Sequence, residues 1–84
     1  MPYLNNLQWQ AELFKYNDDE RKVLLALSHE KYSWRTKNRI VNKTGLSEDE
    51  IDKILANLMS NNKIRASISK KKNIIFGLTE RVDG

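Results

Sequence analysis

Few side chains in this 84-residue chain have the chemistry of a catalyst or a metal ligand. Cysteine is absent and His29 is the single histidine, so one chain cannot build a thiolate site or a zinc site of several imidazoles. Ser28 precedes His29, but adjacent helix positions point in different directions and no nearby acid is placed to orient the pair. A run of acids lacks the spacing of a calcium loop, namely Glu48, Asp49, Glu50 and Asp52. We therefore expect no catalytic residue, no metal, no cofactor and no enzymatic activity.

The charged residues are segregated along the chain. Lysine and arginine number 15 against 11 acids, which gives a net charge of +4. Every charged residue in 31–47 and in 53–79 is basic, whereas acids gather at 18–20 and 48–52. This segregation predicts a positive surface that faces a polyanion, although a basic run is also typical of a solvated face. DNA, RNA and an acidic protein all stay open as partners.

The chain has no segment that predicts membrane insertion. Its longest apolar run covers residues 23–27, far below the roughly 20 residues that a membrane helix needs. The first residues also lack the charged and apolar zones of a secretory signal. We expect a soluble, cytoplasmic protein.

Helix signals begin at residue 17 and recur twice. Asn17 is followed by three acids, which favours a capped helix that buries the aliphatics of 23–27; we expect this helix to end near residue 29 or 30. Thr36 can cap a second helix that Gly45 ends. Ser47 and Glu50 fit a capping box, so a third helix is predicted over 48–60.

Two further segments complete the expected domain. Residues 32–34 alternate like a very short strand, and Trp34 is expected in the core. Past residue 63 the apolar period changes from 3.6 to 2, which predicts an antiparallel hairpin over 63–78 with one buried face and a basic tip, where Asn73 takes the positive φ. The expected core is Val23, Leu24, Leu27, Ile40, Leu46, Ile51, Leu55, Leu58, Ile64 and Phe76.

The first sixteen residues form an extension with two apolar stripes at helical spacing. One stripe holds Leu4, Leu7, Ala11 and Phe14, and the other holds Trp9 and Leu13. A segment that is apolar on two sides packs on its own domain or pairs with a partner, and a homodimer through this segment is one such arrangement. We therefore expect an extension at 1–16, a folded domain at 17–79 and a frayed tail at 80–84.

This order of elements resembles the winged helix-turn-helix family, and regulators of the MarR and ArsR type are similar in it. The resemblance rests on Trp34-Arg35-Thr36 before the second helix, on the turn at 44–47, on the third helix at 51–58 and on the wing at 63–78. It implies a mainly α fold with a small β-hairpin (α+β), with a three-helix core and a two- to three-stranded wing. In that family the third helix enters the major groove and the wing follows the backbone.

The resemblance implies a binding site for double-stranded DNA. Base readout would fall to the outer face of the third helix, at Lys53, Asn57 and Ser60. Phosphate contacts would come from the second helix and the wing, through Arg35, Lys37, Arg39, Lys43, Arg65, Lys70, Lys71 and Lys72. The acids at 48–52 depart from this pattern, because they repel phosphate at the end of the helix that should face DNA.

Two functions therefore compete. The first is a prokaryotic-like DNA-binding domain, either a small transcription regulator or the DNA-binding module of a larger protein. The alternative is a winged-helix module that binds protein and no nucleic acid, since fold alone does not fix function. The basic second helix and wing favour the first, and the acidic start of the third helix favours the second.

Overall fold

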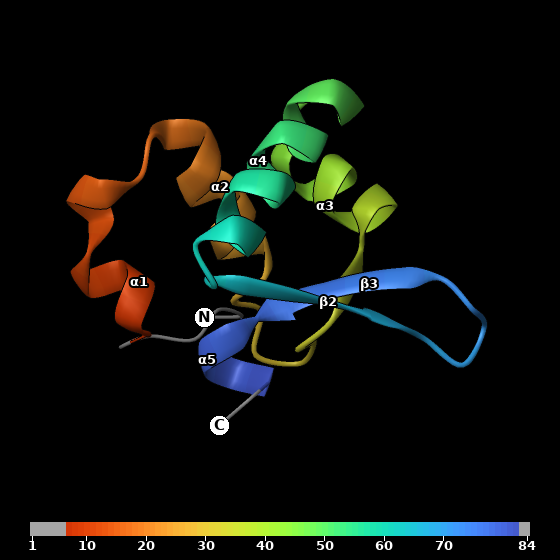
Figure 1. Cartoon of the computed structure of the whole chain (residues 1–84). Helices are drawn as coiled ribbons and strands as arrows, with labels where there is room; N and C mark the ends of the chain where they lie inside the picture. The colour runs from red at the N-terminus through yellow and green to blue at the C-terminus, as the bar shows by residue number, and fades with distance from the viewer. Residues whose placement is uncertain (1–6, 83–84) are drawn as a thin grey trace.

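The computed structural model describes residues 7–82, in which three main helices lie on one face of a three-stranded sheet (Figure 1). Two short helical turns, α1 (Gln8–Ala11) and the 3-10 helix η1 (Leu13–Lys15), precede α2 (Asp18–Ala26). Strand β1 (Arg35–Thr36) leads into α3 (Lys37–Thr44), and α4 (Glu48–Ser60) follows. The wing, β2 (Ile64–Ile68) and β3 (Ile74–Leu78), ends in the short helix α5 (Thr79–Val82). The predicted fold class is confirmed.

The helix starts are capped where the sequence indicates. Asn17 and Glu20 form a reciprocal box, with the Glu20 amide donating to Asn17 Oδ1 over 2.8 Å and the Asn17 amide to Glu20 Oε1 over 3.0 Å. Thr36 Oγ1 and Ser47 Oγ accept from the third amides of α3 and α4. Gly45 closes α3 with φ +74°, a conformation that costs glycine little.

Helix α2 is shorter than predicted. It ends at Ala26 with Leu27 as its C-cap, not near residue 29. Ser28 Oγ donates to the carbonyl of Leu24 over 2.7 Å, and Arg81 donates to the carbonyl of Leu27 over 3.1 Å. These contacts satisfy carbonyls that the end of a helix leaves without an intrahelical partner.

The sheet has the order β1-β3-β2 and is antiparallel throughout. Its first strand is Arg35–Thr36, so the strand predicted at 32–34 lies slightly later in the chain. In the wing, Ile64 pairs with Leu78 and Ile68 with Ile74. Lys72, rather than the predicted Asn73, takes the positive φ in the turn at the wing tip, at +65°.

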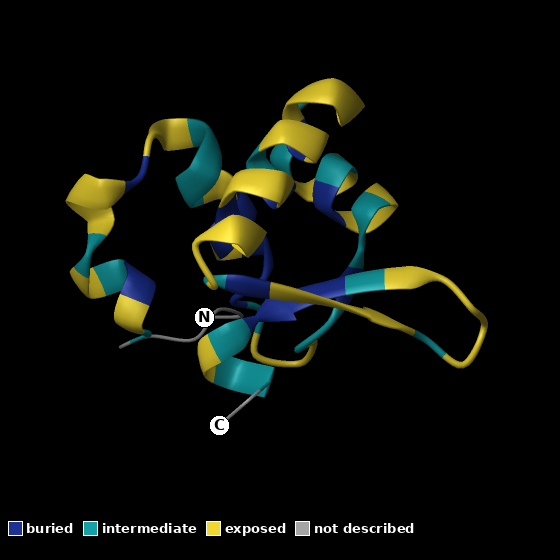
Figure 2. Cartoon of the chain, viewed as in Figure 1, coloured by how far each residue is buried: buried dark blue, intermediate teal, exposed yellow. Residues whose placement is uncertain are grey.

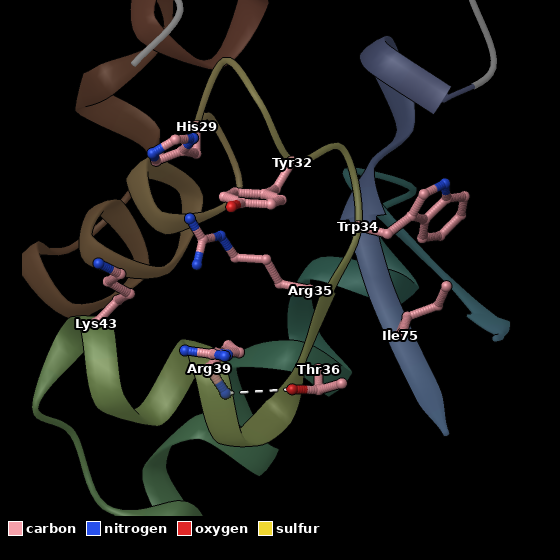
Figure 3. Close-up of a pocket in the computed structure, with 8 residues that line it drawn as sticks. All are labelled: His29, Tyr32, Trp34, Arg35, Thr36, Arg39, Lys43 and Ile75. Atoms are coloured by element: carbon pink, nitrogen blue, oxygen red, sulfur yellow. Dashed lines mark hydrogen bonds between the residues drawn. The ribbon is translucent and has the colours of Figure 1, made fainter. Parts of the chain in front are cut away.

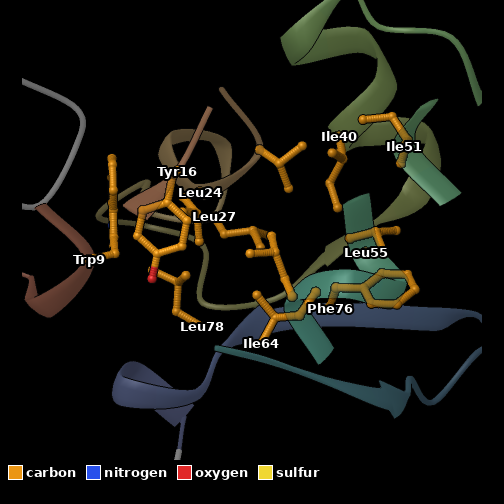
Figure 4. Packing of buried hydrophobic residues seen from close by; sticks show 12 residues of the cluster. Trp9, Tyr16, Leu24, Leu27, Ile40, Ile51, Leu55, Ile64, Phe76 and Leu78 are labelled. Atoms are coloured by element: carbon orange, nitrogen blue, oxygen red, sulfur yellow. The ribbon is translucent and has the colours of Figure 1, made fainter. Parts of the chain in front are cut away.

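The core lies between the sheet and the three main helices (Figure 4). Nine of the ten predicted core residues are buried, while Leu46 is only half-buried against the cluster. Trp9, Tyr16 and Leu78 also lie in the core, although the list of expected core residues does not include them. Trp34 is half-buried rather than buried.

The wing is buried only at its base. Ile68 and Ile74 lie on the same face as Phe76, but they are 70% and 60% exposed. The outer half of the wing extends beyond the helices and is mostly exposed, as Figure 2 shows. The predicted buried face of the hairpin therefore stops about halfway along it.

Both ends of the described chain dock on the domain. Trp9 is buried in the core, and its Nε1 donates to Ser28 Oγ over 3.0 Å. Glu80 accepts from the backbone amides of Gln8 and Trp9. Arg81 donates to three carbonyls, those of Leu27, His29 and Tyr32. The predicted fraying is thus wrong for residues 80–82, while residues 83–84 and the stripe residue Leu4 lie outside the described residues.

Candidate nucleic-acid interface

One polar hollow lies between α3 and the wing, and we call it the α3–wing hollow. Its lining comes from the first turns of α3 and from the wing where β3 begins: Thr36, Lys37, Asn38, Arg39, Asn42, Asn73 and Ile74. Lys37 and Arg39 were predicted to contact phosphate, whereas the three asparagines were not predicted. Asn38 and Asn42 have a sequence signal, since a spacing of four places both on one side of a helix.

The three lysines of the wing tip are all exposed. Lys70, Lys71 and Lys72 lie in a turn that is fixed by its neighbours (Figure 2). The amide of Lys72 donates to the Ser69 carbonyl over 2.9 Å, and the amide of Asn73 donates to Ser69 Oγ over 3.1 Å. The turn therefore presents three cations from one defined loop.

The outer face of α4 is less suited to reading bases than the sequence suggests. Asn57 Nδ2 donates to Glu20 Oε2 over 2.7 Å, and Ser60 Oγ donates to the Asn57 carbonyl over 3.1 Å. Lys53 is exposed. Two of the three predicted base readers are thus engaged within the domain, and a carboxylate beside Asn57 would repel a DNA strand.

An ion pair joins α3 to the acidic start of α4. Lys37 Nζ lies 3.0 Å from Asp52 Oδ1. The hydrogen bond to Asp52 is the main cause that raises the pKa of Lys37, and burial opposes it. Solvent screens an exposed pair of this kind, so it contributes little to stability. The lysine's charge is nevertheless partly neutralised where phosphate contact was predicted.

Three of the predicted phosphate contacts gather in a neighbouring cavity, which we call the Arg35 pocket (Figure 3). Arg35 is only 7% exposed, and its guanidinium carbon lies 5.1 Å from the centroid of the Tyr32 ring. Arg35 is therefore not the surface side chain that the sequence predicted. The lining of the pocket is His29, Tyr32, Trp34, Arg35, Thr36, Arg39, Lys43 and Ile75.

Arg65 stands apart from the other predicted contacts. It alternates with the buried Ile64 along β2, so its side chain leaves the opposite face of the sheet. There it borders a hollow that Trp34 and Val82 also line. The structure thus distributes the predicted phosphate contacts over the wing tip, two hollows and the far face of the sheet.

Two absences hold for residues 7–82. No group of three or more histidine, cysteine or acidic side chains is arranged there to hold a metal ion. Within the same residues, no helix has the length and apolar character needed to cross a membrane.

The three main helices, the turn at Gly45 and the three-stranded sheet with its wing define a winged-helix domain. The sequence model of the PCI domain matches residues 21–76. The chain therefore belongs to the PCI domain family.

Two solved structures are similar in fold. The transcriptional regulator PA4135 superposes with a TM-score of 0.70 at 14% identity, over 92% of this chain and 57% of that one. ZitR of Lactococcus lactis gives 0.61 at 18% identity, over 88% and 58%. At these identities the likeness concerns the winged-helix fold, and it does not single out the MarR or ArsR type. The chain spans little more than half of each, and no curated protein matches its sequence.

Proposed function

We propose that this winged-helix domain binds double-stranded DNA through phosphate contacts from α3 and the wing. The proposal depends mainly on the α3–wing hollow, which is polar and holds Lys37 and Arg39. Its lining residue Asn73 directly follows the three exposed lysines of the tip in the chain. Phosphate contacts supply affinity and register without sequence information. Such a domain binds many DNA sequences with similar affinity.

The acids of α4 limit the proposed contact to the DNA backbone. Glu48, Asp49 and Glu50 occupy the first turn of α4 and are exposed. They stabilise the helix through its dipole, but they repel phosphate wherever the helix approaches a groove. Base readout by Lys53, Asn57 and Ser60 is therefore the weaker part of the proposal.

The proposal extends to the setting of the domain. A role in transcription, as a small regulator or as a module of a longer protein, is supported by the structural neighbour PA4135, a transcriptional regulator. The cytoplasm is the matching location, and no enzymatic step is needed for this role. A homodimer through the N-terminal segment is supported by Phe14, which is 81% exposed, and by Leu13 at 43%. Sedimentation at high micromolar concentration decides between monomer and dimer.

Three alanines in place of Lys70, Lys71 and Lys72 test the proposed contact. Anisotropy of a labelled random duplex at fixed low salt should show weaker binding by the variant, with a similar loss for every duplex sequence. The matched control replaces three lysines outside the wing, Lys15, Lys22 and Lys31, with alanine. Equal affinity of the wing variant and the wild type would contradict the proposal, and the basic wing would then serve only solubility.

One observation favours a second function, a module that binds protein. Ile68 and Ile74 pair across the wing and are mostly exposed on the face that looks toward the helices. Exposed apolar side chains rimmed by charge are typical of protein contacts. If the wild type binds no duplex at low salt, this second function is favoured. If the wild type prefers single-stranded or structured RNA over duplex DNA, the same basic surface binds RNA instead of DNA.

A further inference from the structure

The Arg35 pocket combines size with charge of one sign. It has a volume of about 400 Å³ and lies where the loop after α2, strand β1, α3 and β3 meet. Three of its lining side chains are cationic, namely Arg35, Arg39 and Lys43, and no lining residue carries a carboxylate. Cavities of this volume are typical of sites for small molecules.

Arg35 is placed as a buried donor in this pocket. The residue is 7% exposed, and its Nε has no hydrogen-bond partner among the described residues. Its guanidinium extends toward Tyr32 and His29, away from the sheet (Figure 3). Buried polar groups in proteins almost always have a partner, so a buried Nε–H without one points to a ligand that supplies the acceptor.

The charged side chains around the pocket also shift the pKa of His29, which lines it. Desolvation lowers the pKa of His29, and the positive charges of Arg35 and Lys43 lower it further. Lys31 acts in the same direction, and Glu30 opposes them. The His29 ring, which accepts from the Lys31 amide at Nδ1 over 3.2 Å, therefore senses a net positive field.

We propose that the Arg35 pocket binds the phosphate group of a small molecule. A guanidinium offers parallel N–H donors that match two phosphate oxygens, and Arg39 and Lys43 add charge at the mouth. The volume exceeds that of a phosphate ion, and the ring of Tyr32 offers apolar contact to an attached group. The ligand is free phosphate or a small phosphate ester.

This site shares Thr36 and Arg39 with the α3–wing hollow but differs from the proposed DNA contact in its buried donor, Arg35. The backbone of a duplex cannot reach a side chain that is 7% exposed, whereas a small phosphate can. The lysines at the wing tip do not line the pocket. Loss of DNA binding in the wing variant would therefore leave the pocket proposal intact. Loss of phosphate binding in Arg35→Lys or Lys43→Gln would likewise leave the DNA proposal intact, since neither residue lines the α3–wing hollow.

Titration of the full chain with inorganic phosphate and with adenosine monophosphate tests the proposal. Sodium chloride keeps the ionic strength constant, and NMR follows the Nε–H signal of Arg35 and the pKa of His29. We expect saturable shifts of the Arg35 signal and a rise of the His29 pKa, because bound phosphate offsets the positive field. Tighter binding of adenosine monophosphate identifies an ester as the ligand class, and equal binding identifies free phosphate.

Variants of exposed residues at the mouth of the pocket test phosphate binding without disturbing the fold. Arg39 and Lys43 are exposed, so Arg39→Gln and Lys43→Gln should fold normally and weaken phosphate binding about threefold to tenfold each. Arg35→Lys keeps the positive charge but loses the two parallel N–H donors of the guanidinium, so we expect phosphate affinity to fall about tenfold or more. The matched control is Lys71→Gln, which removes one charge outside the pocket. An Arg35 signal that does not respond to phosphate, or a control as impaired as Arg39→Gln, would overturn the proposal.

Discussion

The contact between Trp9 and Ser28 is the clearest test of how the N-terminal segment is held. Ser28 is fully buried, and its hydroxyl accepts from the Trp9 indole over 3.0 Å while it donates to the Leu24 carbonyl over 2.7 Å. Ser28→Ala leaves the indole N–H buried without a partner, which costs about 1–3 kcal/mol. Trp9→Phe removes the donor and part of the ring, and we expect a loss of about 1–2 kcal/mol.

The double variant separates the hydrogen bond from the packing. The Leu24 carbonyl loses its donor in the single and the double serine variant alike, whereas the indole N–H is left unpaired only in Ser28→Ala alone. The combined loss should therefore fall short of the sum of the single losses by about 0.5–1.5 kcal/mol. Urea unfolding followed by circular dichroism measures each free energy of unfolding, and each kcal/mol lowers Tm by about 4–8 °C at this chain length. Strictly additive losses of unfolding free energy, or no loss in Ser28→Ala, would refute the docking of Trp9. The Trp9 ring would then be available to a partner.

Three further perturbations have definite expected outcomes. Gly77→Ala should lower the free energy of unfolding by about 1–3 kcal/mol, because the new Cβ would lie 2.6 Å from the Ser33 carbonyl; a neutral result in urea would contradict this close approach. Because the pKa of His29 is lowered in the folded chain, the unfolded chain binds the proton first as pH falls below the usual 6.5. The contribution of His29 to the free energy of unfolding should therefore decline below that pH, and His29→Asn should flatten that part of the pH–stability curve. Asp52→Asn should strengthen duplex binding severalfold in anisotropy, since it frees the charge of Lys37 and removes a repelling carboxylate, and weaker binding would argue against DNA at this face.

Local signals made the helices and the wing predictable from the sequence. Asn17, Thr36 and Ser47 cap their helices through contacts only three residues along the chain, and Gly45 closes a turn by its own backbone freedom. The change of period after residue 63 is equally local, so the hairpin could be read without knowledge of the core.

The errors concern contacts between distant parts of the chain. Helix α2 ends early, and residues 80–82 dock, partly because Arg81 reaches carbonyls about fifty residues away. No periodicity within residues 79–82 could reveal those acceptors. Likewise, alternation predicted burial along the whole wing, but Ile68 and Ile74 extend past the helices that would have covered them.

The sequence indicated which types of residue form the candidate site, but it did not indicate where several of them lie in the fold. Charge segregation predicted a basic surface as a group of residues, and the lysines of the wing tip are exposed. Sequence could not show that Arg35 points inward under Tyr32, because a two-residue strand presents alternate side chains to opposite faces and its register depends on pairing with Phe76. The engagement of Asn57 by Glu20 is a contact across 37 positions and has no local signal.

A salt titration of binding to a random duplex tests the central claim most directly. If the wing tip and the α3–wing hollow neutralise three to five phosphates, log K should fall against log salt with a slope of about −3 to −4.5, at roughly −0.9 per phosphate. Alanine at Lys70, Lys71 and Lys72 should flatten that slope by about one to three units. A slope near zero, or no binding by the wild type at low salt, would contradict the account and favour the protein-binding module.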